Sequence, residues 1–71
     1  MYDIITILVD NAVKKGYNKA DAERRLELML SDVNNIDNLA LDLVYNGYSS
    51  TNKVYGYIEQ LKARDLIKGK V

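Results

Sequence analysis

Apolar residues recur at helical spacing in four separate runs of this chain, and no proline interrupts any of them. Within each run they approximate the i, i+3, i+4, i+7 template that marks one face of an amphipathic helix. The runs are Ile5, Leu8, Val9, Ala12 and Val13; Ala22, Leu26, Met29, Leu30 and Val33; Ile36, Leu39, Ala40, Leu43 and Val44; and Val54, Tyr57, Ile58 and Leu61. This spacing predicts an all-α fold of four helices.

A glycine followed by a tyrosine closes the first and third runs, at Gly16-Tyr17 and Gly47-Tyr48. Glycine readily takes the left-handed conformation at the end of a helix, and an apolar residue after it can fold back over the last turn. We expect Tyr17 to fold back over Ala12 in this way. The predicted architecture is a compact four-helix domain made of two helix–Gly-Tyr–helix hairpins, with residues 1–71 forming a single domain.

Residues with capping side chains precede the three later runs. The expected N-caps are Asn18 for the second helix, Asn34 or Asn35 for the third, and Ser49 or Ser50 for the fourth. We expect the fourth helix to fray between residues 65 and 69.

The two hairpins also resemble each other in sequence. A shift of 31 residues places Gly16 on Gly47 and Leu8 on Leu39. A duplicated hairpin accounts for this likeness, and so does independent use of the same cap chemistry. The sequence does not distinguish duplication from shared cap chemistry.

Composition fits a folded cytoplasmic protein. Hydrophobic residues make up 48% of the chain and charged residues 28%, so the sequence is too apolar for an intrinsically disordered chain. Cysteine is absent, and small secreted domains usually need disulfides. The apolar opening lacks a basic flank and ends at Asp10, so we expect neither a signal peptide nor a membrane helix.

Residues that usually carry catalysis are scarce. The chain has no histidine and no cysteine, the side chains most often used as bases and nucleophiles near neutral pH. Gly16 and Gly47 are single glycines and do not form a phosphate-binding loop. Asp37 and Asp42 are typical of surface charges and too sparse for a calcium loop. We therefore expect no enzymatic activity, no cofactor, no metal site and no small-molecule substrate.

Charge is unevenly distributed, although the formal net charge is zero. Residues 1–49 hold five basic and eight acidic side chains, whereas residues 50–71 hold five basic and two acidic ones. An asymmetry of this kind indicates a basic face in the last third of the chain.

From Leu39 onward, a short helix is followed by a turn rich in Ser, Thr and Asn, a second helix containing Leu61, and the apolar pair Leu66-Ile67. This pattern resembles the helix-turn-helix half of winged-helix regulators, and the resemblance covers residues 39–71. The turn is longer than the family's usual spacing, and we expect no wing because the sequence ends at Val71. The resemblance implies a wingless DNA-binding regulator of transcription, with homodimer formation as a further expectation.

The turn before the fourth helix would be the first part to meet DNA. Hydroxyls and amides at a helix N-terminus can contact phosphates or base edges, and basic side chains add contacts with the DNA backbone. The candidate DNA-binding residues are Ser50, Thr51, Asn52, Lys53, Tyr55, Lys62, Lys68 and Lys70, and Arg64 adds a further positive charge. Gly56 costs its helix about 1 kcal/mol relative to alanine, so either DNA or a neighbouring helix is expected close to it.

A second class of function is a protein–protein interaction module or inhibitor that binds no nucleic acid. Four apolar residues lie off the predicted stripes, namely Ile7, Leu28, Leu41 and Tyr55, and Tyr45 is off its stripe as well. A patch of such side chains would mark an interface with a protein partner or a second copy of the chain. The two alternatives differ in one structural expectation, because DNA binding requires the basic side chains of residues 50–71 to converge on one exposed face.

Overall fold

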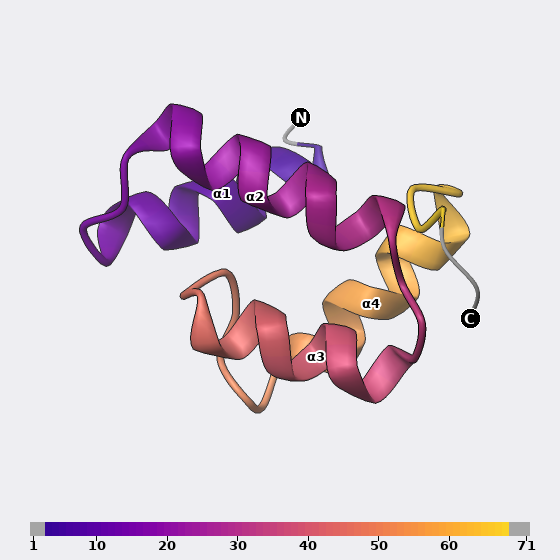
Figure 1. Ribbon diagram of the computed structural model, residues 1–71. Coiled ribbons are helices and arrows are strands. Elements are labelled where there is room, and N and C mark those ends of the chain that lie inside the picture. Colours follow the sequence, from indigo (N-terminus) through magenta and orange to yellow (C-terminus); the bar gives the residue numbers. More distant parts are fainter. Residues whose placement is uncertain (1–2, 69–71) are drawn as a thin grey trace.

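The computed structural model describes residues 3–68 and folds them into four helices that form two layers (Figure 1). The helices are α1 (Ile4–Lys14), α2 (Lys19–Ser31), α3 (Ile36–Tyr45) and α4 (Val54–Ala63). α1 packs against α2 and α3 packs against α4, while α1–α4 and α2–α3 contacts join the two hairpins. The predicted all-α fold of two hairpins is confirmed.

Side-chain caps start the first three helices. The Asp3 carboxylate accepts a hydrogen bond from the backbone N–H of Ile4 at 2.8 Å. The side-chain oxygen of Asn18 accepts a hydrogen bond from the backbone N–H of Asp21 at 3.2 Å, and that of Asn35 accepts one from the backbone N–H of Asp37 at 2.7 Å. The expected caps of α2 and α3 are therefore confirmed, with Asn35 in the cap position of α3.

Schellman motifs end α1 and α3 as the Gly-Tyr pairs predict. Gly16 and Gly47 both have positive φ, of 101° and 81°. The backbone N–H of Tyr17 donates to Ala12, and that of Tyr48 donates to Leu43. The side chains of the two tyrosines behave differently. Tyr48 is fully buried, whereas Tyr17 is 38% exposed and its ring lies beside Gly47.

Up to Lys68 the expected fraying of α4 is not seen, because a third Schellman motif ends this helix, and Gly69 lies outside the described residues. Asp65 takes the left-handed conformation with a φ of 56°, and the N–H of Leu66 donates to Leu61 at 2.9 Å. The N–H of Lys68 then donates to the carbonyl of Leu30 at the end of α2, at 2.8 Å. The backbone therefore holds residues 64–68 against the first hairpin.

Replacing Asp65 with glycine should stabilise the domain by about 1 kcal/mol. A side chain at positive φ costs about 1–2 kcal/mol, less for aspartate, and a negative charge is unfavourable at a helix C-terminus. Urea denaturation of Asp65→Gly and Asp65→Ala measures the effect. Alanine retains a Cβ atom at positive φ, so it should not stabilise the domain to the same extent. A glycine variant less stable than the wild type would contradict the left-handed conformation of residue 65.

The expected serine cap of α4 is also wrong. α4 begins at Val54, and its N-cap residue Lys53 makes no side-chain capping bond within the described part of the chain. Ser49 is buried and its hydroxyl donates to the carbonyl of Ser50, which also accepts from the N–H groups of Lys53 and Val54. The connection from α3 first buries Tyr48 and Ser49, so a further turn precedes the helix.

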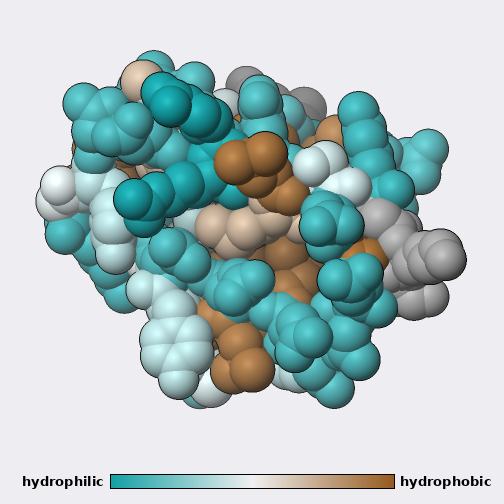
Figure 2. All heavy atoms as spheres, viewed as in Figure 1, coloured by the Kyte–Doolittle hydropathy of each residue, from teal (hydrophilic) through white to brown (hydrophobic). Residues whose placement is uncertain are grey.

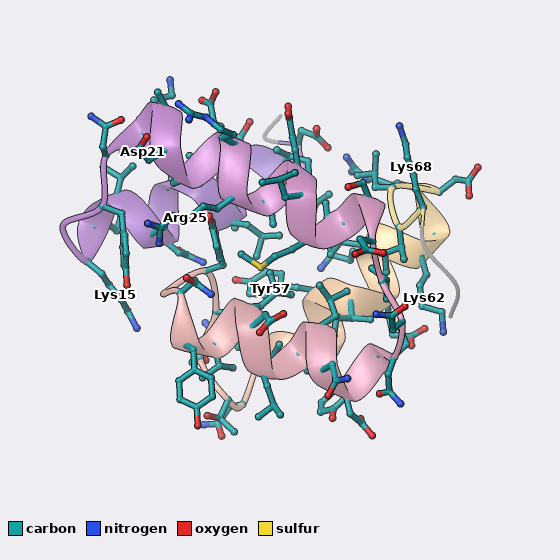
Figure 3. The ribbon with its side chains drawn as sticks, viewed as in Figure 1. Lys15, Asp21, Arg25, Tyr57, Lys62 and Lys68 are labelled. Carbon is teal, nitrogen blue, oxygen red and sulfur yellow. The ribbon has the colours of Figure 1, made fainter. Side chains whose placement is uncertain are left out.

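The core lies between the two layers and contains most of the predicted stripes. The buried apolar residues are Ile4, Leu8, Val9, Ala12, Ala22, Leu26, Leu30, Val33, Leu39, Ala40, Leu43, Tyr48, Val54, Ile58 and Leu61. Val13 is 40% exposed, contrary to expectation, and Ile4 is buried in its place at the start of the helix. Tyr57 is half-buried, and in the view of Figure 3 it is seen between the two layers.

Tyr48 connects the second hairpin to the first. Its hydroxyl donates to the backbone carbonyl of Ala22 in α2 at 2.5 Å. The side-chain amide of Asn11 in α1 donates to the carbonyl of Tyr48 at 3.0 Å. Burial raises the pKa of the Tyr48 hydroxyl above its usual range, although Arg25 has an opposing effect. Packing and hydrogen bonds at one residue thus fix how the layers are joined.

Candidate functional site

The predicted DNA-contacting turn is exposed. Ser50, Thr51, Asn52 and Lys53 all lie on the surface between α3 and α4. A shallow hollow next to this turn is lined by Asn52, Lys53, Gly56, Tyr57 and Gln60. A Cβ atom added at Gly56 would meet no atom of the described chain within 4 Å. The expectation of a neighbouring helix at Gly56 is therefore wrong, and this side of α4 is open.

Tyr55 is exposed, and it also makes a hydrogen bond that links two helices. Its hydroxyl donates to the Asp37 carboxylate at 2.7 Å, which links the start of α4 to the start of α3. This hydrogen bond raises the pKa of the Tyr55 hydroxyl above its usual range. The remaining ring surface is accessible, with 54% of the residue exposed.

The described basic side chains of the last third do not gather on one face. Lys53 and Lys62 are separated by nine positions, which places them about half a helical turn apart, on opposite sides of α4. Lys62 lies 3.5 Å from Glu59, and Arg64 lies 2.6 Å from Asp3. Lys62 and Lys68 are found at the C-terminal end of α4 (Figure 3). Lys53 therefore does not share a face of α4 with Lys62, and Lys70 lies outside the described residues.

A groove of about 480 Å³ lies where the end of α2 faces α3, and we call it the α2–α3 groove. Its lining residues are Met29, Asp32, Val33, Asn34, Asn35, Asn38, Leu39, Leu41, Asp42 and Tyr45. Figure 2 shows apolar surface within the hollow between the two layers, bordered by hydrophilic side chains. Leu41 is 54% exposed and Tyr45 is 80% exposed at this site. Most of the accessible lining of this groove is polar, and Leu41 and Tyr45 are the large side chains that remain accessible on it.

The sequence contains a signal for this groove. Asn38, Leu41, Asp42 and Tyr45 follow the spacing i, i+3, i+4, i+7, so α3 carries a second stripe besides its core stripe. The off-stripe positions of Leu41 and Tyr45 were visible in the sequence. Their convergence with Met29 and Val33 depends on the α2–α3 packing and could not be read from spacing.

The charged residues that line the α2–α3 groove are both acidic. No lysine or arginine occurs between Arg25 and Lys53, and the charged residues in that interval are Glu27, Asp32, Asp37 and Asp42. Asp32 and Asp42 line the groove and are exposed. Neither forms an ion pair with any residue in the range 3–68. No three carboxylates of the described residues gather closely enough to hold a metal ion.

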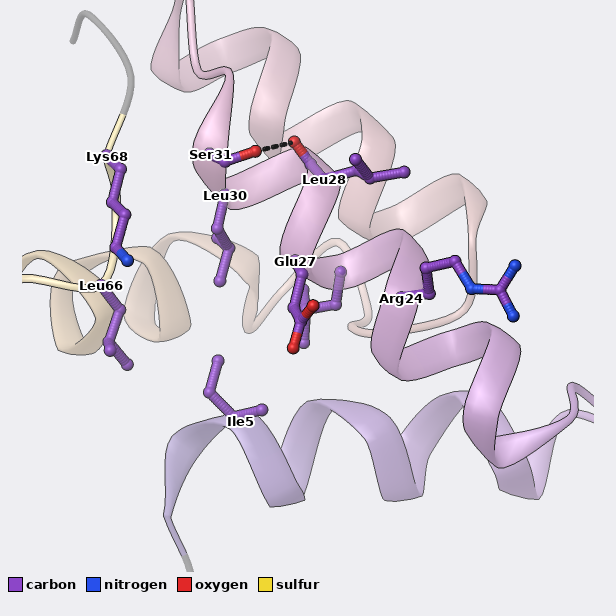
Figure 4. Close-up of a pocket in the computed structure, with 9 residues that line it drawn as sticks. Ile5, Arg24, Glu27, Leu28, Leu30, Ser31, Leu66 and Lys68 are labelled. Carbon is purple, nitrogen blue, oxygen red and sulfur yellow. Dashed lines mark hydrogen bonds between the residues drawn. The ribbon is translucent and has the colours of Figure 1, made fainter.

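A second groove of about 490 Å³ lies between α1, α2 and the segment after α4 (Figure 4). Ile5, Leu30 and Leu66 point into it, and Leu28 stands at its edge with 64% of its surface exposed. Its charged lining residues are of both signs, namely Arg24, Glu27 and Lys68. The lining of this groove is more apolar than that of the α2–α3 groove, but among the described residues Leu28 is its only strongly exposed large apolar residue, whereas the α2–α3 groove has Leu41 and Tyr45.

The chain matches no protein-family model, no curated protein and no solved structure. Among residues 3–68, the helices are all too short, or insufficiently apolar, to cross a bilayer. Function is therefore inferred from the two grooves, the turn before α4 and the charges around them.

Proposed function

We propose that this chain is a small helical protein-interaction module that binds its partner through the α2–α3 groove. The observation that carries the proposal is the exposure of Leu41 and Tyr45, one helical turn apart on α3, beside the groove between α2 and α3. Neither side chain is needed in the core, because α3 already buries Leu39, Ala40 and Leu43. Contiguous exposed apolar surface marks interaction sites, and tyrosine is enriched at the energetic centres of interfaces.

Peptides selected from a random display library on the immobilised protein test this function. Selected peptides should bind the double variant Leu41→Ser, Tyr45→Ser at least about tenfold more weakly than the wild type, since loss of a tyrosine at the energetic centre of an interface costs about 2 kcal/mol or more and about 1.4 kcal/mol is tenfold. Both positions are exposed, so the double variant should keep the helical circular dichroism spectrum of the wild type.

Leu28→Ser is the matched control, because Leu28 is equally exposed but belongs to the other groove. Peptides selected on the wild type should bind this variant normally. Peptides that bind the double variant as tightly as the wild type, or that lose binding only to Leu28→Ser, would overturn the proposal.

DNA binding is the second candidate function, favoured by the exposed turn at Ser50–Lys53 and the open face of α4 at Gly56. A fluorescence anisotropy titration of mixed-sequence duplex DNA at low salt tests it. Binding should weaken steeply with salt, and Lys53→Ala should flatten that dependence. Absence of binding at about tens of micromolar protein would exclude this function.

A cytoplasmic location accompanies both candidates. It is supported by the absence of cysteine from the sequence, since extracellular domains of this size usually depend on disulfides.

A further inference from the structure

We infer that the partner bound in the α2–α3 groove is a basic amphipathic helix, with an apolar face that contacts Leu41 and Tyr45 and lysine or arginine that faces Asp32 and Asp42. This inference rests on the proposed function and specifies the chemistry of the partner. Two independent observations carry it, the sign of the charges around the groove and the helical spacing of its exposed apolar side chains.

The charges come from Asp32 and Asp42. Both carboxylates line the groove, both are exposed, and neither is neutralised by an ion pair within the described residues. The rest of the polar lining consists of the neutral amides of Asn34, Asn35 and Asn38. A partner with basic edges would complement this field, and complementary charge steers encounter and suppresses binding of unsuitable partners.

The same charges disfavour two other occupants. Nucleic acid would bring its phosphates next to unpaired carboxylates. A second copy of this chain, docked by a two-fold axis through the groove, would bring Asp32 and Asp42 together with their own equivalents. Like charges at such an interface oppose association, so a homodimer through this surface is disfavoured near neutral pH.

The shape of the contact favours a helix. Leu41 and Tyr45 stand one helical turn apart on α3, and the groove floor between the layers is formed by Met29, Val33 and Leu39. An amphipathic helix presents apolar side chains at i, i+3, i+4 and i+7, a spacing that fits a groove between packed helices. The groove volume of about 480 Å³ accommodates a few such side chains.

A labelled amphipathic peptide of leucine and lysine tests the inference, with a peptide of the same pattern containing glutamate in place of lysine as control. Anisotropy titrations of the intact protein should show binding of the lysine peptide and much weaker binding of the glutamate peptide. The affinity for the lysine peptide should fall as salt rises, because exposed charges are screened. Equal affinity for the two peptides would overturn the inference about charge.

Two carboxylate variants locate the effect. Asp32→Asn and Asp42→Asn should each weaken binding of the lysine peptide by about two- to fivefold, the range expected for an exposed ion pair. Asp10→Asn makes the same chemical change on α1, away from the groove, and should leave the affinity unchanged. An equal loss in Asp10→Asn would show attraction to the whole molecule instead of the groove and would overturn the inference.

The double variant Leu41→Ser, Tyr45→Ser separates the inference from the function on which it rests. One possible result is that the wild type binds the lysine and glutamate peptides equally well and the double variant binds neither. This result would keep the groove as a docking site and would reject a basic partner. Unchanged binding of both peptides would instead reject the groove itself and, with it, the proposed function.

Discussion

Replacing Tyr48 with alanine should destabilise the domain by about 3–5 kcal/mol, the range measured for large buried aromatic residues. The side chain is buried between the hairpins, and its hydroxyl donates to the carbonyl of Ala22. A chain of 71 residues has a total stability of about 4–11 kcal/mol at the usual stability per residue. Urea denaturation followed by circular dichroism should therefore show a severely weakened or unfolded domain.

Tyr48→Phe separates packing from hydrogen bonding at the same position. This variant keeps the ring and removes the hydroxyl, so it should lose only about 1 kcal/mol. A loss as large as that of Tyr48→Ala would mean that the hydrogen bond, and not the buried ring, dominates. No loss at all would contradict the bond to Ala22.

Tyr48 should also make stability depend on alkaline pH. Burial raises its pKa in the folded state above the ordinary value of 10.0, so folding favours the neutral hydroxyl. The stabilisation is complete below the pKa of the unfolded chain and is lost as the pH rises from there through the raised folded-state pKa. Denaturation midpoints measured across this range should fall less steeply for Tyr48→Phe than for the wild type.

Replacing Gly47 with alanine should cost about 2–3 kcal/mol. Positive φ costs an alanine about 1–2 kcal/mol, and a Cβ at this position would also lie 3.1 Å from Lys15 Cδ and 3.2 Å from Tyr17 Cε2. Gly16 has positive φ but no neighbour within 4 Å of its Cβ position in the described chain. Gly16→Ala should therefore lose only the backbone contribution, about 1–2 kcal/mol.

A double-mutant cycle with Tyr17→Ala isolates the crowding at Gly47. Removal of the Tyr17 ring should relieve part of the cost of Gly47→Ala, so the double variant should be more stable than the sum of the single effects predicts. Strict additivity, together with equal costs at Gly16 and Gly47, would show that the contact between the two turns contributes nothing.

Local chemistry made most of the fold predictable. Asn18 and the Gly-Tyr pairs act within one turn of their own helices, so short-range pattern was sufficient to place them. The predicted N-cap at Ser49 was wrong because tertiary packing buries this residue together with Tyr48, so its side chain is not free to cap α4. Asp65 was missed because left-handed residues other than glycine carry no reliable signal in the sequence.

The candidate site was harder to predict than the fold. The sum of charges over residues 50–71 suggested a basic face, but Lys53 and Lys62 project to opposite sides of α4 and Arg64 pairs with Asp3. A sum of charges along the chain does not show the side of the helix to which each side chain projects. The α2–α3 groove depends on the packing of two helices, although the exposed positions of Leu41 and Tyr45 were already apparent from their spacing.

The likeness between the hairpins extends to their helix ends and not to their connections. Gly16 and Gly47 end α1 and α3 with the same hydrogen-bond pattern. The connection from α1 to α2 covers residues 15–18, whereas that from α3 to α4 covers residues 46–53. The longer connection holds Tyr48, so the second hairpin carries the residue that joins the layers.

Amide chemical-shift mapping of the intact, isotope-labelled protein with the leucine-lysine peptide tests most directly whether the α2–α3 groove is the binding surface. The largest shifts should cluster on the groove-lining residues between positions 29 and 45, and duplex DNA added to a parallel sample should leave those signals in place. Peptide-induced shifts centred on the turn before α4, or on the groove beside Ile5 and Leu66, would contradict the proposed docking surface.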